Sequence, residues 1–206
     1  TPLYGFHLDE NRRGDILFKV TAKLEGISDY GALGAYVGKI VGTKVPVFDG
    51  ISNPYIEELV YLGAALASSG SVAMFHAVGV TPEAPTVEAA FGGKKYDTIL
   101  ITDKEIAAGR RQLTSATDPK VDYVAIGCPH FSLRQIKEVA MLLQGKKVHK
   151  DVTFWIHTNV AIKGDGFFVV SDNLLNKPAA YAYSRNGNFQ TDAAGYLVND
   201  EGYYLL

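Results

Sequence analysis

One stretch, residues 121–143, constrains the fold more than any other part of the chain. Its first residues, VDYVAI, form a short apolar and β-branched run that is typical of a buried strand. The turn sequence Gly-Cys-Pro-His follows, and Ser132 with Gln135 then forms an S-x-x-Q capping box. Apolar residues recur at helical spacing from there to Leu143. The stretch therefore predicts a strand, a tight turn and a helix with one buried face.

The chain up to residue 159 repeats this alternation of strands and helices. Strands are expected at residues 15–24, 44–48, 72–76, 96–101 and 152–156. Helices are expected from Ser28 to Val41, from Asn53-Pro54 to about Ala67, and from a second capping box of Thr102 and Glu105 to about Leu113. The pattern favours an α/β fold with a mostly parallel sheet and helices on both faces. Four glycines in the first helix, at 31, 34, 38 and 42, indicate close packing on a neighbour.

The pattern changes after residue 159. Short strands are expected at residues 166–170, 181–185, 196–198 and 203–206, and Asn186-Gly187 is a strong hairpin signal. No helical periodicity is present there, so we expect a short antiparallel β segment. We place the domain boundary near Thr158 to Val160, which divides the chain into residues 1–159 and 160–206.

Charge and composition exclude some classes of function. The 206 residues carry a formal net charge of -2, so no strong field favours nucleic acid or an anionic membrane as partner. No signal peptide and no apolar run of membrane-spanning length is present. One cysteine excludes an internal disulfide and fits a reducing, cytoplasmic compartment. Because the sequence starts at Thr1 without an initiator Met, we expect a fragment.

The single cysteine, Cys128, carries the sharpest chemical hypothesis. It is predicted to lie between the end of a strand and the start of a helix, where free N–H groups and the helix dipole favour a thiolate. Ligands in open α/β sheets bind at the carboxyl ends of strands. The alternative is that a lone cysteine is a small buried apolar residue.

Two polar residues flank that cysteine. Ser132 is either the N-cap of the helix or a substrate contact. His130 either binds substrate or hydrogen-bonds a backbone carbonyl, and the residues favour neither reading.

Two further candidates lie earlier in the chain. His76 ends a predicted strand just before a proline-rich loop that contains Glu83, although a lone histidine is more often structural. Arg12 belongs to a polar cluster and could clamp a carboxylate or phosphate, although a solvated turn also explains it. No residue can be assigned as a catalytic base, and phosphate-binding loops, Ser-His-Asp signatures and zinc spacings are absent from the sequence.

From Thr1 to Asn159 the chain resembles the aconitase X large subunit or catalytic domain. The matching stretches are TPLYGFHLDENRRG, YGALGAYVGKIVG, LGAALASSGSVAMFHAVGVTPEAPT, AFGGKK and AIGCPHFSL. The resemblance implies an aconitase-like α/β architecture and an iron-sulfur hydro-lyase. Its substrate would be a small hydroxy acid such as cis-3-hydroxy-L-proline or mevalonate 5-phosphate. It also implies a small swivelling domain or subunit as partner.

The resemblance also implies roles for individual residues. Cys128 would ligate the iron-sulfur cluster, and His130, Ser132, His76 and Arg12 are the candidates for substrate binding. The family uses three cysteines, and the other two match motifs outside this sequence. We therefore expect the cluster to be absent or incomplete here, and the chain to be inactive alone.

From Ala161 to Leu206 the chain resembles a flagellar hook or distal-rod protein. The matching stretches are AIKGDGFFVVSDN, YSRNGNFQTDAAGYLVN and GYYLL. Such proteins are structural subunits of an axial tube, so this resemblance implies self-assembly in a bacterial flagellum and no active site. The combination predicts a chimera of two families. The rival readings are a structural flagellar segment and a soluble α/β domain without a cofactor.

Overall fold

The computed structural model describes residue 3 and residues 5–158, 168–171, 181–184, 189–200 and 202–205. The chain divides into two compact units, Thr1–Thr117 and Asp118–Leu206. Among the described residues, no helix combines the length and apolar character needed to cross a membrane.

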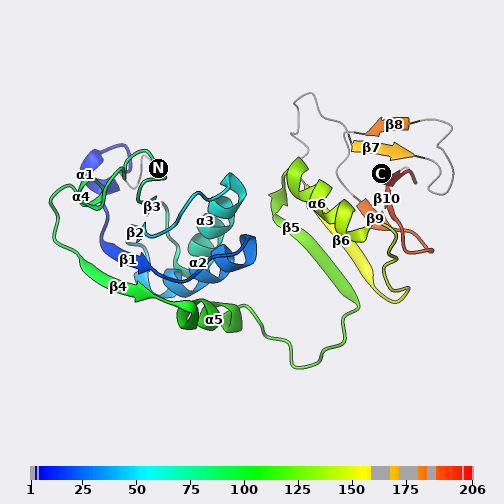
Figure 1. Ribbon diagram of the computed structural model, residues 1–206, viewed down its shortest axis with the longest axis horizontal. Helices are drawn as coiled ribbons and strands as arrows, with labels where there is room; N and C mark the ends of the chain where they lie inside the picture. Colours follow the sequence, from blue (N-terminus) through cyan, green and yellow to red (C-terminus); the bar gives the residue numbers. More distant parts are fainter. Residues whose placement is uncertain are drawn as a thin grey trace. The chain divides into compact units, whose positions relative to one another are not determined.

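The first unit is built on a parallel sheet (Figure 1). Its elements are α1 (Asp9–Arg12), β1 (Ile16–Val20), α2 (Ile27–Val41), β2 (Pro46–Asp49), α3 (Ile56–Gly70), β3 (His76–Ala77), α4 (Val87–Phe91), β4 (Asp97–Ile101) and α5 (Asp103–Gln112). The strand order is β3-β2-β1-β4, and every neighbouring pair is parallel. The predicted parallel α/β arrangement is confirmed.

Alternating side chains of β1 face two layers of helices. Phe18 is completely buried with Leu33 of α2 and Leu62 of α3. Leu17 points to the other face, where it packs with Phe91 of α4. Burying one such side chain contributes about 1.5–3 kcal/mol, so both layers hold the sheet in place. Helices cover both faces of this sheet, as predicted.

Two of the four glycines predicted in the first helix explain the close contact of α2 with α3. A Cβ on Gly34 would lie 2.7 Å from the backbone oxygen of Leu62, and one on Gly38 would collide with Ser69. Gly31 and Gly42 have no such neighbour within 4 Å. The predicted close packing is thus confirmed at Gly34 and Gly38.

The starts of two helices differ from the prediction. Helix α2 begins after Gly26 without a side-chain cap, so Ser28 is not its N-cap. Helix α3 begins after Tyr55, whose backbone N–H donates to Glu58 at 2.8 Å. Asn53 has a φ of 46°, which belongs to a turn and not to a helix. The Asn53-Pro54 pair therefore precedes the helix instead of starting it.

Other short elements also differ. The strand predicted at residues 72–76 is confined to His76–Ala77, and α4 was not predicted. Thr86 caps α4 by accepting a hydrogen bond from the backbone N–H of Ala89. The capping box of α5 forms as predicted, with Glu105 accepting from the N–H of Thr102 at 2.9 Å.

The second unit contains a second sheet. Its elements are β5 (Tyr123–Phe131), α6 (Leu133–Leu143), β6 (Thr153–Thr158), β7 (Phe168–Ser171), β8 (Tyr181–Ser184), β9 (Phe189–Thr191), β10 (Leu197–Asn199) and β11 (Tyr204–Leu205). The order is β5-β6-β9-β10-β11-β7-β8. Strands β5 and β6 are parallel, whereas the remaining pairs are antiparallel, as predicted for the C-terminal segment. The predicted hairpin at Asn186-Gly187 lies outside the described residues.

This sheet continues across the boundary drawn from the sequence pattern. Ile156 of β6 pairs with Phe189 of β9, and these side chains are only 1% and 3% exposed. The residues on either side of the predicted boundary therefore share one sheet. The boundary near Thr158 to Val160 stays a prediction.

Candidate functional site

Cys128 lies within β5 and not in the turn that the sequence predicted. The strand runs on through Gly127, Cys128, Pro129 and His130 to Phe131. Its pairing with β6 shifts between Ile126 and Phe131, so the chain changes register there instead of direction. The Cys128–Pro129 peptide bond is cis.

Gly127 makes this shift possible. Its φ is 99°, and a Cβ at this position would collide with the backbone oxygen of His157 on β6. No side chain fits, so β5 and β6 approach closely at this point. The next residue, Cys128, is exposed, which removes the alternative of a buried apolar cysteine.

The two flanking candidates have different surroundings. Ser132 caps α6: its hydroxyl accepts from the N–H of Gln135 at 3.3 Å, and Gln135 Oε1 accepts from the N–H of Ser132 at 3.0 Å. The predicted capping box is confirmed. His130 is exposed on β5, as Cys128 is. Both side chains are open to solvent, and they precede Ser132, the N-cap of α6, by four and two residues respectively.

An iron-sulfur cluster needs several protein ligands close together in space. Cys128 is the single cysteine of the sequence. Among the described residues, no group of three His, Cys, Asp or Glu side chains is arranged to hold a metal ion. The described residues therefore do not provide a complete set of ligands for an iron-sulfur cluster.

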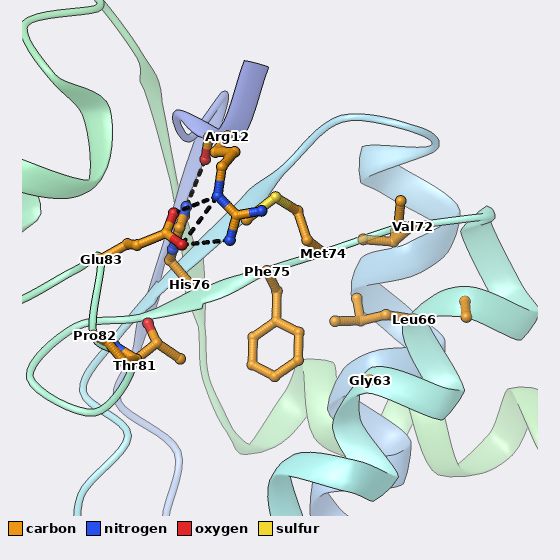
Figure 2. Close-up of a pocket in the computed structure, with 12 residues that line it drawn as sticks. Arg12, Gly63, Leu66, Val72, Met74, Phe75, His76, Thr81, Pro82 and Glu83 are labelled. Carbon is orange, nitrogen blue, oxygen red and sulfur yellow. Dashed lines mark hydrogen bonds and ion pairs between the residues drawn. The ribbon is translucent and has the colours of Figure 1, made fainter. Parts of the chain in front are cut away.

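The first unit contains a cavity of about 490 Å³ (Figure 2). Its volume lies within the usual range for small-molecule sites. Apolar side chains from α3 and from the segment before β3 form one part of its lining, among them Leu66, Val72 and Phe75. Polar side chains line another part, and Figure 2 shows them gathered on one side: Arg12, His76 and Glu83.

Arg12 and Glu83 form a two-point ion pair at this polar side. The Nε of Arg12 donates to Glu83 Oε2 at 2.8 Å, and its Nη2 donates to Oε1. The Nη1 of Arg12 donates to the Phe6 carbonyl at 3.0 Å. The hydrogen bond from Arg12 and its positive charge hold the pKa of Glu83 below its usual range.

His76 is 3% exposed, and its ring contacts the backbone of Arg12. Its Nε2 lies 2.6 Å from the backbone oxygen of Arg12. Because a carbonyl oxygen only accepts, Nε2 carries the proton. This hydrogen bond holds the backbone of Arg12 in place. The guanidinium of Arg12 takes no part in it and lines the cavity.

The proline-rich loop that carries Glu83 is held by its own hydrogen bonds. The N–H of Ala77 donates to the Thr81 hydroxyl at 3.0 Å, and the N–H of Gly79 donates to the Ala84 carbonyl at 2.8 Å. Gly79 has a φ of 74°, which suits the turn. This bonding fixes the position of Glu83.

The candidates thus fall into two groups. The first unit brings Arg12 and His76 together with Glu83, and the second unit carries Cys128, His130 and Ser132. Sequence reasoning placed Glu83 in a loop after a strand but did not pair it with Arg12. It also missed the apolar wall around Phe75, for which the apolar face of α3 was the available signal.

Three family models match the chain. The aconitase X second domain matches residues 14–111, and the aconitase X third domain matches residues 121–166. The flagellar hook protein FlgE/F/G D1 domain matches residues 161–206.

Individual proteins give the same division. The phosphomevalonate dehydratase large subunit of Methanothermobacter thermautotrophicus is 43% identical over 79% of this chain and 39% of its own length. The cis-3-hydroxy-L-proline dehydratase of Pseudomonas aeruginosa is 38% identical over 75% of this chain and 27% of its own length. The flagellar basal-body rod protein FlgG of Borreliella burgdorferi is 43% identical over 24% of this chain and 17% of its own length.

A solved structure is also similar. The crystal structure of Thermococcus kodakaraensis aconitase X in its holo-form superposes with a TM-score of 0.69 at 38% identity, over 79% of this chain and 41% of that chain. The chain spans less than half the length of these dehydratases.

Proposed function

We propose that this chain supplies part of the core of a hydro-lyase of the aconitase X type, because residues 14–111 and 121–166 match the second and third domains of that family. Its substrate would be a small anionic hydroxy acid. Mevalonate 5-phosphate and cis-3-hydroxy-L-proline are the candidates, because relatives of this chain are named as dehydratases of these two compounds.

The cavity beside Arg12 is the observation that carries this proposal. A guanidinium is well shaped to bind a carboxylate or phosphate at two points. Glu83 and the Phe6 carbonyl already orient Arg12, and the remaining N–H groups of its fork would bind the substrate anion. The apolar wall of Leu66, Val72 and Phe75 would receive the carbon skeleton.

The same pair explains why we expect no dehydration by this chain alone. Dehydration needs a base for a carbon-bound proton and an acid or metal for the departing hydroxyl. Glu83 is the carboxylate lining the cavity among the described residues, and its hydrogen bond from Arg12 lowers its pKa. A carboxylate with a lowered pKa is a weaker base. We assign no residue of this chain as the base.

We further propose that Cys128 is one thiolate ligand of the family's iron-sulfur cluster, with the other ligands supplied by residues outside this sequence. When bound, such a cluster supplies a Lewis acid for the hydroxyl group. The exposed position of Cys128 on β5 supports this role. His130 would contact substrate beside it, and Ser132 would do so in addition to capping α6.

Anaerobic incubation with iron and sulfide tests the cluster proposal without an activity assay. We expect the full chain to retain less than one cluster per molecule after desalting, and Cys128→Ser to abolish the iron that remains. A stable, brown protein with a full complement of cluster iron would contradict the proposal.

We also propose that residues 1–159 and 160–206 have separate origins, and that a small swivelling subunit or domain is the partner of the first part. Relatives that are named large subunits support such a partner. We propose a cytoplasmic location for this chain as well.

Calorimetric titration of the full chain with each candidate substrate tests the main proposal. We expect binding to at least one of them, a loss of that binding in Arg12→Met, and no loss in Arg111→Met. The backbone oxygen of Arg12 that binds His76 is retained in Arg12→Met, so the local fold should persist. Equal binding by both variants, or turnover by the chain alone, would contradict the proposal.

A second candidate function is supported by the match of residues 161–206 to a hook protein domain and to a rod protein. That function is structural self-assembly in a bacterial flagellum. Electron microscopy of the concentrated full chain separates the two candidates: tubes or filaments would favour the structural function, and dispersed particles would favour the enzymatic one.

A further inference from the structure

The second unit contains a cavity of its own, of about 730 Å³. Its walls come from the end of α6, the loop that follows it, and strands β10 and β11. The helix and loop belong to the part that matches aconitase X, and the two strands belong to the part that matches the hook protein. The proposed substrate site in the first unit does not include this cavity.

Part of the cavity lining is apolar. It includes Met141 and Leu143 of α6 and Leu197 and Leu205 of the strands. Met141 is 66% exposed, although it is a large apolar side chain. An apolar side chain left open beside a cavity loses the stabilisation that burial would supply, and a bound hydrocarbon group would restore it.

Another part of the lining is basic. Lys137, Lys146 and Lys147 line the cavity. The Nζ of Lys147 lies 4.8 Å from the centroid of the Tyr196 ring, so this ammonium group points over an aromatic face at the rim. None of the three lysines forms an ion pair with another residue in the described part of the chain.

Nearby acidic groups do not neutralise these lysines. Glu138 of α6 pairs with Arg134. Asp192 accepts hydrogen bonds from the backbone N–H groups of Ala194 and Tyr196, each at 2.9 Å. Both carboxylates therefore have partners other than these lysines among the described residues.

The carbonyl groups at the C-terminal end of α6 do not strongly oppose the attraction of these lysines for an anion. The carbonyl of Leu143 accepts from the N–H of Lys146 at 2.8 Å, and that of Met141 accepts from the N–H of Gln144 at 3.4 Å. These bonds engage carbonyl groups that would otherwise repel an anion.

A backbone hydrogen bond joins the loop after α6 to the segment before β10. The N–H of Val148 donates to the Gly195 carbonyl at 3.3 Å. Gly195 has a φ of 85°, and a Cβ there would lie 2.7 Å from the oxygen of Val148. The cavity therefore depends on a contact that joins the two family-like parts within this unit.

We propose that this cavity binds a small amphipathic anion, namely a medium-chain carboxylate. The hydrocarbon chain lies along Met141, Leu197 and Leu205, and the carboxylate lies between Lys146 and Lys147. The volume is sufficient for one such molecule. Because the lysines are exposed, the affinity depends on salt concentration.

Calorimetric titration of the full chain tests this site, with decanoate as the probe and decanol as its uncharged counterpart. We expect saturable binding of one decanoate below its micelle concentration, and weaker binding of decanol. Lys146→Glu with Lys147→Glu should weaken decanoate binding about tenfold or more, because each lysine changes from an attractive to a repulsive charge.

The control is the double variant Lys120→Glu with Lys150→Glu, which changes the net charge by the same amount outside the cavity. Its decanoate affinity should stay within a factor of about two of the parent. Lys146→Gln with Lys147→Gln serves if the glutamate variant does not fold. Equal binding of decanol and decanoate, an equal loss in the control, or non-saturating binding would overturn the proposal.

Discussion

At the scale of single residues, the atoms that a new Cβ would meet decide whether replacing a glycine by alanine stabilises or destabilises the fold. Gly109 of α5 and Gly127 of β5 each face the backbone of another element, Ala32 and His157 respectively. Backbone cannot move aside as a flexible side chain can. Gly31 of α2 has open space around it, so helix propensity alone decides the effect there.

Gly109→Ala should therefore destabilise the chain, although alanine is the better helix former. We expect a loss of about 1–3 kcal/mol in the free energy of unfolding, because the new methyl group pushes α5 away from α2. Gly31→Ala should instead stabilise by about 0.5–1 kcal/mol. Urea denaturation of both variants checks the pair, and two changes of the same sign would contradict this reading of the contacts.

The Arg12–Glu83 ion pair predicts that the free energy of unfolding depends slightly on pH. The hydrogen bond from Arg12 lowers the pKa of Glu83 in the folded state, so the pair stabilises the fold above the unfolded pKa of about 4.3. This contribution is lost as pH falls through the folded pKa. Because Glu83 is half-exposed, the contribution is below about 1 kcal/mol.

Glu83→Gln should thus lower the free energy of unfolding slightly at pH 7 and have no such effect near pH 3. Urea denaturation of the parent and the variant at both pH values measures the difference. A larger loss at pH 3 than at pH 7 would show that the ion pair is not the source.

At the scale of elements, the sequence predicted helix starts best where a side-chain cap fixes them. The boxes Thr102–Glu105 and Ser132–Gln135 located the starts of α5 and α6. The start of α3 was missed because Tyr55 is not a usual cap residue. The length of β5 was missed because Gly127 signals a turn in sequence, whereas here it allows a register shift against β6.

The two caps give a matched pair of tests in different units. Ser132→Ala and Thr102→Ala should each lower the free energy of unfolding of their own unit by about 1 kcal/mol. Hydrogen exchange should become faster in α6 for the first variant and in α5 for the second. Faster exchange in both helices for either variant would contradict separate stabilisation of the two units.

At the scale of the whole molecule, family likeness and compact structure divide the chain at different places. The matches change from aconitase X to the hook protein domain near residues 161–166, whereas the chain divides into its two compact units between Thr117 and Asp118. A linear sequence pattern cannot reveal that β9 pairs with β6, because strand neighbours far apart in sequence are chosen by packing. For the same reason the sequence named Arg12 and His76 as candidates but not the cavity that joins them to Glu83.

Phe189→Ala tests whether the second sheet is continuous. The removal of this buried ring should cost about 3–5 kcal/mol, and amide exchange should become faster in β6 as well as in β9. Gln190→Ala is the control, because Gln190 is exposed on the same strand. Faster exchange confined to residues 189–205 would show that β6 does not depend on β9.

The proposed substrate site is tested most directly by a cycle of two ligands and two proteins. Mevalonate 5-phosphate and mevalonate are titrated into the parent chain and into Arg12→Met. If Arg12 binds the phosphate, the substitution weakens mevalonate 5-phosphate binding about tenfold or more relative to mevalonate, as expected for a charge-assisted hydrogen bond. An equal loss for both ligands would show that Arg12 binds their shared carboxylate instead of the phosphate, and no loss for either would contradict the assignment of this cavity to an anionic hydroxy acid.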